Sequence, residues 1–301
     1  MNRTVFLNGG FAPAQDARIS IWDGGWLHGA GLFETMRAYK GRIFRLDAHL
    51  DRLMSSAEKL LFPLERPDLP LTSDFDELLH RNELSEARLR LTVSAGPTIG
   101  VEPDDITTGD GRPRLTVCAT ASPVSPYPPQ LHSKGMTVTI SPYKVSPDDP
   151  IAGHKCTDYL PRLLALRDAH AKGCNEAIWF TTNNLLSEGS ISNVFLVRDH
   201  RLMTSPVETP VLPGITRAVV IELASAAGVE VEQKPLTIDD LLDADEVFLT
   251  NSIMEVMPVC RVEKCEIGGG KPGPLTRKMS NEYRSVVEKE CKSHGQSQDQ
   301  R

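Results

Sequence analysis

Four prolines fall within nine residues in the stretch SPVSPYPPQ (122–130), and this stretch divides the chain more clearly than any other. Proline lacks the backbone N–H that helices and central strands use, so neither structure can run through such a segment. We therefore expect a linker at 122–130. It would separate a small N-terminal α+β domain (1–121) from a larger domain (131–290), which a polar tail (291–301) follows.

The part before the linker mixes strands with one clear helix. TVFLNGGFAP (4–13) predicts two short strands joined by a Gly-Gly turn. Between residues 49 and 62 the apolar residues recur at helical spacing. ARLRLTVSAG (87–96) and RLTVCATA (114–121) alternate and contain β-branched residues, so each predicts a strand.

The part after the linker also mixes both types of element. Strands are predicted at 136–140, 176–182 and 191–197, and helices at 157–173 and at 209–228, the latter after a Pro-Gly turn. A short helix with Thr237 as its N-cap precedes a strand that ends in TNS (250–252).

Composition excludes several classes of protein. The net charge of −7 over 301 residues argues against a nucleic-acid partner, because phosphate binding needs a basic face. No apolar run approaches the roughly 20 residues of a membrane span, and the first residues lack a secretory core. We expect a cytoplasmic protein without a membrane anchor or a metal, whose cysteines are free thiols: 118, 156, 174, 260, 265 and 291.

One lysine and one acid stand in settings that suit catalysis. In IAGHKCTDYL (151–160), Lys155 has no acidic residue nearer than Asp158, and a nucleophilic lysine needs a site that favours the neutral amine. In LLSEGSISNVFLV (185–197), Glu188 lies at a Gly/Ser turn before an apolar strand, where it can point into a pocket. Taken singly, each could equally be an exposed surface residue.

Two further stretches suit a bound phosphate. LPGITR (212–217) places the backbone N–H groups of Ile215 and Thr216 at a helix N-terminus, which attracts anions. The TNS stretch (250–252) ends a strand with two hydroxyls and an amide. A lysine, an acid for a ring nitrogen and two phosphate-binding stretches together indicate a phosphorylated aromatic cofactor.

With these stretches in this order, the chain resembles the class IV aminotransferases, the fold-type IV enzymes that use pyridoxal 5'-phosphate. The resemblance covers roughly residues 3–262 and rests on these segments: WLHGAGLFETMRAYKGRIFRLDAHLDRL, AGHKCTDYLPRLLA, EAIWFTTNNLLSEGSISNVFLV, TPVLPGITR and ADEVFLTNSIMEVMPV. It implies an α+β fold of two domains, a small N-terminal one and a larger one with a β-barrel-like core. It also implies a homodimer that acts on a small amino or carboxylate substrate.

The resemblance further implies a role for each matching residue. Lys155 would hold the cofactor covalently and transfer the proton, and Glu188 would pair with the pyridine nitrogen so that the ring accepts electrons. Tyr159 matches a tyrosine near the phenolic oxygen of the cofactor. The remaining cofactor-binding residues would contact the phosphate: Arg52, Ile215, Thr216 and Ser252.

Within the family, the segments ARLRLTVSAG, GLFETMRAYKG and LTNSIMEVMPV are most similar to 4-amino-4-deoxychorismate lyases, which release pyruvate and 4-aminobenzoate. Branched-chain and D-amino acid aminotransferases are the alternative, and a catalytically inactive binding protein on the same fold is a second one. A dicarboxylate substrate needs more than one cation. Arg90 is our first choice, Arg37 and His28 follow, and a solvent-facing pair of Arg88 with Arg90 stays open.

Overall fold

The computed structural model of the chain describes residues 3–97, 107–108 and 111–292. The chain forms two units. Unit 1 comprises Met1–Ser125, Lys155–Asp158 and Val287–Arg301, and unit 2 comprises Pro126–His154 and Tyr159–Val286. The division after Ser125 falls inside the proline-rich stretch, although regular structure enters this stretch from both sides. Strand β6 runs on to Pro123, and helix α5 begins with Pro129, where a missing N–H costs nothing.

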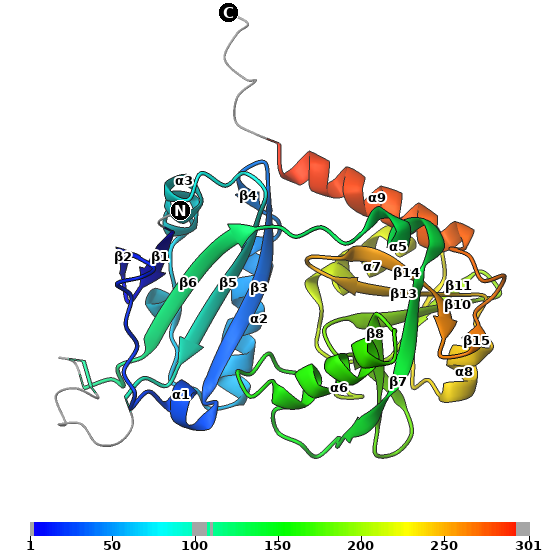
Figure 1. Cartoon of the computed structure of the whole chain (residues 1–301), viewed down its shortest axis with the longest axis horizontal. Coiled ribbons are helices and arrows are strands. Elements are labelled where there is room, and N and C mark those ends of the chain that lie inside the picture. The colour runs from blue at the N-terminus through cyan, green and yellow to red at the C-terminus, as the bar shows by residue number, and fades with distance from the viewer. Residues whose placement is uncertain (1–2, 98–106, 109–110, 293–301) are drawn as a thin grey trace, which may run out of the picture. The chain divides into compact units, whose positions relative to one another are not determined.

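Unit 1 is built on a six-stranded sheet with the strand order β2-β1-β6-β5-β3-β4, and its adjacent strands run antiparallel. Helices α2 and α3 pack on one face of this sheet (Figure 1). Its elements in chain order are β1 (Thr4–Leu7), β2 (Gly10–Pro13), α1 (Gly24–His28), β3 (Gly31–Tyr39), β4 (Arg42–Ile43), α2 (Leu46–Lys59), a 3-10 turn η1 (Arg66–Asp68), α3 (Thr72–Arg81), β5 (Ala87–Ser94) and β6 (Thr116–Pro123).

Alternation along β5 gives this sheet two different faces. Leu89, Leu91 and Val93 are fully buried, so they lie on the face that α2 and α3 cover. Arg88 and Arg90 point to the opposite face, as the alternating sequence predicts. The helix predicted at 49–62 is confirmed as α2, which begins three residues earlier and buries the apolar stripe.

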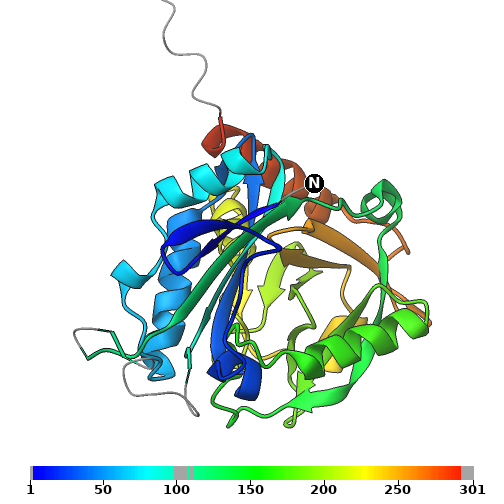
Figure 2. The ribbon, with the colours of Figure 1, turned by 60° about the vertical axis from the view of Figure 1, so that its left-hand side comes forward.

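Unit 2 contains a nine-stranded sheet that curls on itself (Figure 2). The order is β12-β11-β10-β13-β14-β7-β8-β9, with β15 beside β14. Its elements are α5 (Pro129–Lys134), β7 (Met136–Val145), α6 (Leu160–Ala171), β8 (Glu176–Thr181), β9 (Leu186–Gly189), β10 (Asn193–Arg198), β11 (Arg201–Thr204), α7 (Ile215–Ala226), β12 (Val231–Gln233), α8 (Ile238–Leu242), β13 (Glu246–Asn251), β14 (Glu255–Val262), β15 (Cys265–Glu266) and α9 (Pro274–Glu290), whose last residues are counted with unit 1.

Several local predictions for this part are confirmed. The side chain of Thr237 accepts a hydrogen bond from the backbone N–H of Asp240, so it caps α8 as expected. The predicted strands appear as β7, β8 and β10, and the α+β class is confirmed. Helix α6 starts at Leu160, three residues later than predicted, because the residues before it take part in extended pairing. Most of the predicted polar tail (291–301) lies outside the described residues.

Candidate active site

Lys155 is held at the edge of the unit 1 sheet by backbone pairing. Its carbonyl oxygen accepts from the N–H of Phe33 at 2.8 Å, and the N–H of Thr157 donates to the carbonyl of Gly31 at 2.8 Å. Between these bonds, Cys156 forms an antiparallel bridge with Leu32. This short extended segment therefore lies along β3 as an additional strand, which explains why Lys155–Asp158 belongs to unit 1.

The side chain of Lys155 lies against an aromatic ring that it shares with an arginine. Its Nζ atom is 4.5 Å from the ring centroid of Phe33, and Cζ of Arg90 is 3.8 Å from the same centroid. Both contacts are short enough for cation–π attraction. Phe33 is buried, so the structure brings the predicted catalytic lysine and the first predicted substrate arginine to one apolar residue.

The predicted substrate residues differ in where they lie. Register places Arg37 opposite Arg88, and Arg90 opposite Thr35, so these side chains share the sheet face that α2 and α3 leave uncovered. Arg88 is exposed and Arg90 is half-buried, which favours Arg90 as the arginine that contacts a ligand. His28 is exposed at the end of α1, and no contact among the described residues places it beside this group.

Arg52, predicted to bind phosphate, is held by a buried ion pair on the other side of β3. Its Nε and Nη2 atoms donate to the carboxylate of Glu34 at 2.8 and 2.5 Å, and His49 Nδ1 lies 2.8 Å from the same carboxylate. Burial alone would raise the pKa of Glu34, but the charge of Arg52 and the hydrogen bonds from His49 and Arg52 lower it to about 2. Glu34 thus fixes the guanidinium by one edge.

His49 stays neutral in this arrangement. Burial lowers its pKa, and this outweighs the opposite effect of the hydrogen bond to Glu34. The charges of Arg52 and Lys155 lower the pKa of His49 further, so the lysine amine is close enough to contribute to its electrostatics. The Glu34–His49 contact was not predicted from the sequence.

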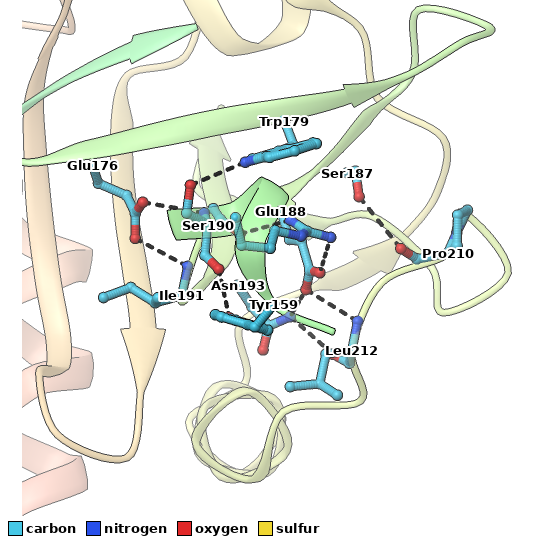
Figure 3. Close-up of polar contacts among 12 residues, drawn as sticks. Tyr159, Glu176, Trp179, Ser187, Glu188, Ser190, Ile191, Asn193, Pro210 and Leu212 are labelled. Atoms are coloured by element: carbon cyan, nitrogen blue, oxygen red, sulfur yellow. Dashed lines mark hydrogen bonds and ion pairs between the residues drawn. The ribbon is translucent and has the colours of Figure 1, made fainter. Parts of the chain in front are cut away.

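Glu188, at the end of β9, accepts hydrogen bonds on both carboxylate oxygens (Figure 3). Oε1 accepts from Arg162 Nη2 at 2.8 Å, while Oε2 accepts from the backbone N–H of Leu212 at 3.0 Å and from Asn193 Nδ2 at 3.3 Å. Glu188 is 8% exposed. The prediction that this acid sits in a defined pocket rather than on a surface turn fits these contacts.

Asn193 connects Glu188 to the start of helix α7. Its Nδ2 also donates to the carbonyl of Leu212 at 2.9 Å. A Cβ atom on Gly214 would lie 1.9 Å from Asn193 Oδ1, so only glycine fits at this N-cap. The first N–H groups of a helix have no intrahelical acceptor. Ile215 and Thr216 therefore stand at a positive helix end that lies next to the glutamate, as LPGITR predicts.

A second buried acid shapes the turn between β9 and β10. Glu176 accepts from the N–H groups of Ser190 and Ile191 and from the hydroxyl of Ser192. Burial raises its pKa to about 6, against the opposing effect of these hydrogen bonds. Tyr159 donates its hydroxyl to the carbonyl of Ser190 at 2.7 Å (Figure 3). The predicted cofactor tyrosine is thus fastened to the same turn.

Ser252 lies in the turn between β13 and β14. The neighbouring Asn251 builds this turn, because its Oδ1 accepts from the N–H groups of Ile253 and Met254 while its Nδ2 donates to the carbonyl of Ile191. The hydroxyl of Thr250 is buried and has no hydrogen-bond partner among the described residues. The TNS stretch therefore reaches the β9–β10 turn, and it carries a buried hydroxyl that a ligand could satisfy.

The predicted site residues thus form two groups, each within its own unit. Unit 1 carries Lys155, Arg52, Arg90 and Arg37, and unit 2 carries Tyr159, Glu188, Ile215, Thr216 and Ser252. Four supporting residues were missed: Glu34, His49, Arg162 and Asn193. Of these, Asn193 alone had a sequence signal, since it opens an apolar strand five residues after Glu188.

No cluster of three or more histidine, cysteine or acidic residues suits a metal ion in the part of the chain that the structure describes. All six cysteines are free thiols. Of the helices within the described ranges, none is both long and apolar enough for a membrane crossing.

Comparison with known proteins gives one consistent result. The family model for amino-transferase class IV matches residues 31–262. The chain is 35% identical over 289 residues to the "Putative branched-chain-amino-acid aminotransferase" of Methanocaldococcus jannaschii, covering 94% of this chain and 96% of that protein. It is 32% identical over 286 residues to the D-alanine aminotransferase of Bacillus licheniformis, with the same coverage of 94% and 96%.

Solved structures agree. The branched-chain amino acid aminotransferase of Escherichia coli matches with a TM-score of 0.83 and 27% identity, covering 100% of this chain and 99% of that one. The T.th. enzyme of the same name, solved with pyridoxamine 5'-phosphate, matches at 0.83 and 29%, covering 95% and 94%. A "Putative 4-amino-4-deoxychorismate lyase" from Legionella pneumophila matches at 0.78 and 25%, covering 90% and 96%.

Proposed function

The chain belongs to the class IV aminotransferase family, which makes it an enzyme, and on that premise we propose that it is a pyridoxal 5'-phosphate-dependent aminotransferase of branched-chain amino acids. The observation that carries the choice of substrate is the 35% identity to a protein of that name across 94% of the chain. The lyase, our first choice from the sequence, has weaker support, because the relative with that name is 25% identical.

The residues of this chain fit the proposed cofactor. A pyridinium nitrogen needs an acidic acceptor, and Glu188 is a buried carboxylate fixed by three donors. A phosphate needs N–H donors, and the start of α7 and the guanidinium of Arg52 supply them. The buried Thr250 hydroxyl lacks a partner among the described residues, as expected of an atom that waits for a ligand.

When bound, the cofactor supplies an electron sink for the carbon that carries the amino group. The protein residues bind, orient and move protons around it. Lys155 holds the cofactor and carries the proton to and from the reacting carbon. Glu188 keeps the pyridine nitrogen protonated, while Ile215, Thr216, Ser252 and Arg52 bind the phosphate, and Tyr159 contacts the phenolic oxygen. Arg90 and Arg37 face the substrate carboxylate, and His28 is the weakest of the proposed substrate residues.

A half-reaction test distinguishes the candidate substrates. Purified protein is saturated with pyridoxal 5'-phosphate, freed of excess, and mixed with leucine, valine or D-alanine without a keto acid. We expect leucine and valine to convert the bound aldehyde to the amine form in a 1:1 ratio and to release the matching keto acid. Conversion by D-alanine alone would move the enzyme to the D-amino acid branch.

The lyase remains the second candidate because of the arginines on the uncovered face of the unit 1 sheet. Arg37, Arg88 and Arg90 lie on adjacent strands there, and a substrate with two carboxylates would use two of them. Aminodeoxychorismate, generated in a coupled assay, would then yield pyruvate without any added keto acid. Protein that neither releases pyruvate nor converts bound cofactor would be an inactive binding protein on this fold.

We also propose that the enzyme is a cytoplasmic homodimer. The segment before and within α1 exposes several large apolar side chains that a monomer would leave in water: Ile19, Ile21, Trp22, Trp26 and Leu27. Light scattering on the eluting peak of a size-exclusion column should give twice the chain mass of 33.1 kDa. A mass that stays at one chain at micromolar concentration would contradict the proposal.

A further inference from the structure

We propose that Arg162 is a positioning residue for the reaction, which acts by holding the carboxylate of Glu188 in one orientation. The proposal rests on the proposed function, in which Glu188 pairs with the ring nitrogen of the cofactor. Arg162 was not among the residues predicted from the sequence. It lies in the first turn of α6, three residues after Tyr159.

Three contacts fix the guanidinium of Arg162. Its Nη2 donates to Oε1 of Glu188 at 2.8 Å, and its Nη1 donates to the carbonyl of Gly189 at 3.1 Å. Its Cζ lies 4.5 Å from the ring centroid of Trp179, which is within range of a cation–π contact. Trp179 is itself fixed, because it is buried and donates from Nε1 to Ser190 Oγ at 3.0 Å.

Burial separates this ion pair from most other ion pairs of the protein. The side chains of Arg162 and Glu188 are 16% and 10% exposed, whereas those of Arg81 and Glu77 in an exposed helical pair are 45% and 40% exposed. An exposed pair contributes little because water screens it. A buried pair costs desolvation, and that cost is tolerated where geometry is good and the remaining polar atoms are satisfied. Both conditions hold here.

The arrangement leaves the carboxylate of Glu188 little freedom. Oε2 is held by the N–H of Leu212 and by Asn193, and Arg162 donates to Oε1. Without Arg162 the carboxylate would lose this contact on Oε1 and could rotate about its last bond. A hydrogen bond to a ring nitrogen depends on direction, so rotation would weaken it.

Arg162 also acts together with Tyr159 on one short segment. The hydroxyl of Tyr159 donates to the carbonyl of Ser190, while Arg162 binds the two residues before it. The start of α6 is therefore fastened to the end of β9 at three consecutive residues, 188–190. This geometry connects the proposed ring-nitrogen acid with the proposed phenolic-oxygen contact through protein atoms alone.

A double-mutant cycle tests the proposal. Wild type, Arg162→Gln, Glu188→Gln and the double variant are prepared as holoenzyme. Three quantities are compared: the visible absorbance band of the bound cofactor, the rate at which cofactor dissociates, and the half-reaction rate with the active amino acid. We expect Arg162→Gln to shift the band in the same direction as Glu188→Gln and to slow the half-reaction by about 10- to 100-fold, the scale of one charge-assisted hydrogen bond.

Coupling is the decisive readout. If Arg162 acts through Glu188, the double variant should be no slower than Glu188→Gln alone, because the second change removes nothing further. Arg162→Lys keeps the charge but loses the planar fork, so its rate should fall between wild type and Arg162→Gln. Arg167→Gln, on an exposed position of the same helix, is the matched control and should behave as wild type.

Different failures have different signatures. Losses that multiply in the double variant, or an unchanged band and rate in Arg162→Gln, would overturn the proposal. If Arg162→Gln fails to fold, as circular dichroism and apoprotein melting would show, Arg162→Lys decides: a wild-type rate and band overturn the proposal, and a partial loss that disappears in the Glu188→Gln background supports it. Failure of the proposed function looks different, since Glu188→Gln itself would then match wild type.

Discussion

Arg52 meets the carboxylate of Glu34 with two donors, Nε at 2.8 Å and Nη2 at 2.5 Å, although the two residues lie 18 positions apart on β3 and α2. The carboxylate is 1% exposed. This geometry leaves the orientation of the guanidinium to Glu34, because a fork bound along one edge cannot rotate. Phosphate binding by Arg52 therefore depends on an acid that would not touch the phosphate.

Glu34→Gln should destabilise unit 1. At neutral pH the change leaves a buried guanidinium without its counter-charge, so we expect the free energy of unfolding to fall by about 2–4 kcal/mol. Urea denaturation followed by circular dichroism measures this loss. The matched control is Glu77→Gln, which breaks an exposed pair with Arg81 and should cost less than about 1 kcal/mol. Equal effects of the two changes would contradict this prediction.

The acid dependence of stability should change in the same variant. The pKa of Glu34 falls from 4.5 to about 2 on folding, so the unfolded chain binds more protons between these values. The stability that this carboxylate contributes is complete above pH 4.5 and is lost as the pH falls toward 2. The upper limit is about 3 kcal/mol. The difference between wild type and Glu34→Gln in free energy of unfolding should therefore shrink over this range.

Lys155 should carry the cofactor covalently. Borohydride reduction of the holoenzyme followed by peptide mapping should place the phosphopyridoxyl group on the peptide that contains Lys155. Lys155→Ala should abolish turnover while the fold is kept, because the pairing of this segment with β3 uses backbone atoms. Lys172→Ala, on an exposed lysine that pairs with Asp168, is the control. Label on any other lysine would refute the assignment.

Glu188→Gln should slow catalysis more than it weakens cofactor binding. The amide lacks the charge that keeps the pyridine nitrogen protonated, whereas the phosphate contacts are unchanged. We expect a loss of one to a few kcal/mol, roughly tenfold to several hundredfold in kcat. Glu230→Gln, on an acid that is 62% exposed, should leave kcat as in wild type. Unchanged kcat in Glu188→Gln would show that this acid only supports the turn.

Arg90→Ala should mainly raise KM. Its guanidinium lies over Phe33, beside the amine of Lys155, where it can bind a substrate carboxylate equally in the ground and transition states. Loss of one such charge-assisted contact should raise KM about tenfold or more. Arg88→Ala is the matched control two residues away on the same face, because Arg88 is exposed. A larger effect from Arg88 would reverse the roles of the two arginines.

Local patterns predicted more of this protein than its long-range contacts. Thr237 and the acid three residues later indicated the capped start of α8, and helical spacing indicated α2, because capping and burial of one helix face depend on residues three or four apart. Helix α9 was missed although Met279, Tyr283 and Val287 recur every four residues and are buried. That signal was present in a stretch whose polar residues obscured it.

The sequence by itself determined the two-part α+β organisation and which lysine and acid are the candidates for the chemistry, because the glycine, proline and hydroxyl residues around Lys155 and Glu188 act on their own neighbours. The tertiary structure alone decided which residues support them. Glu34 meets Arg52 only when α2 packs on β3, and Arg162 reaches Glu188 only when α6 packs beside β8 and β9. Lys155 is fixed by β3, more than a hundred residues earlier in the chain. Such pairs depend on how elements pack in space, and periodicity along the chain carries no information about that.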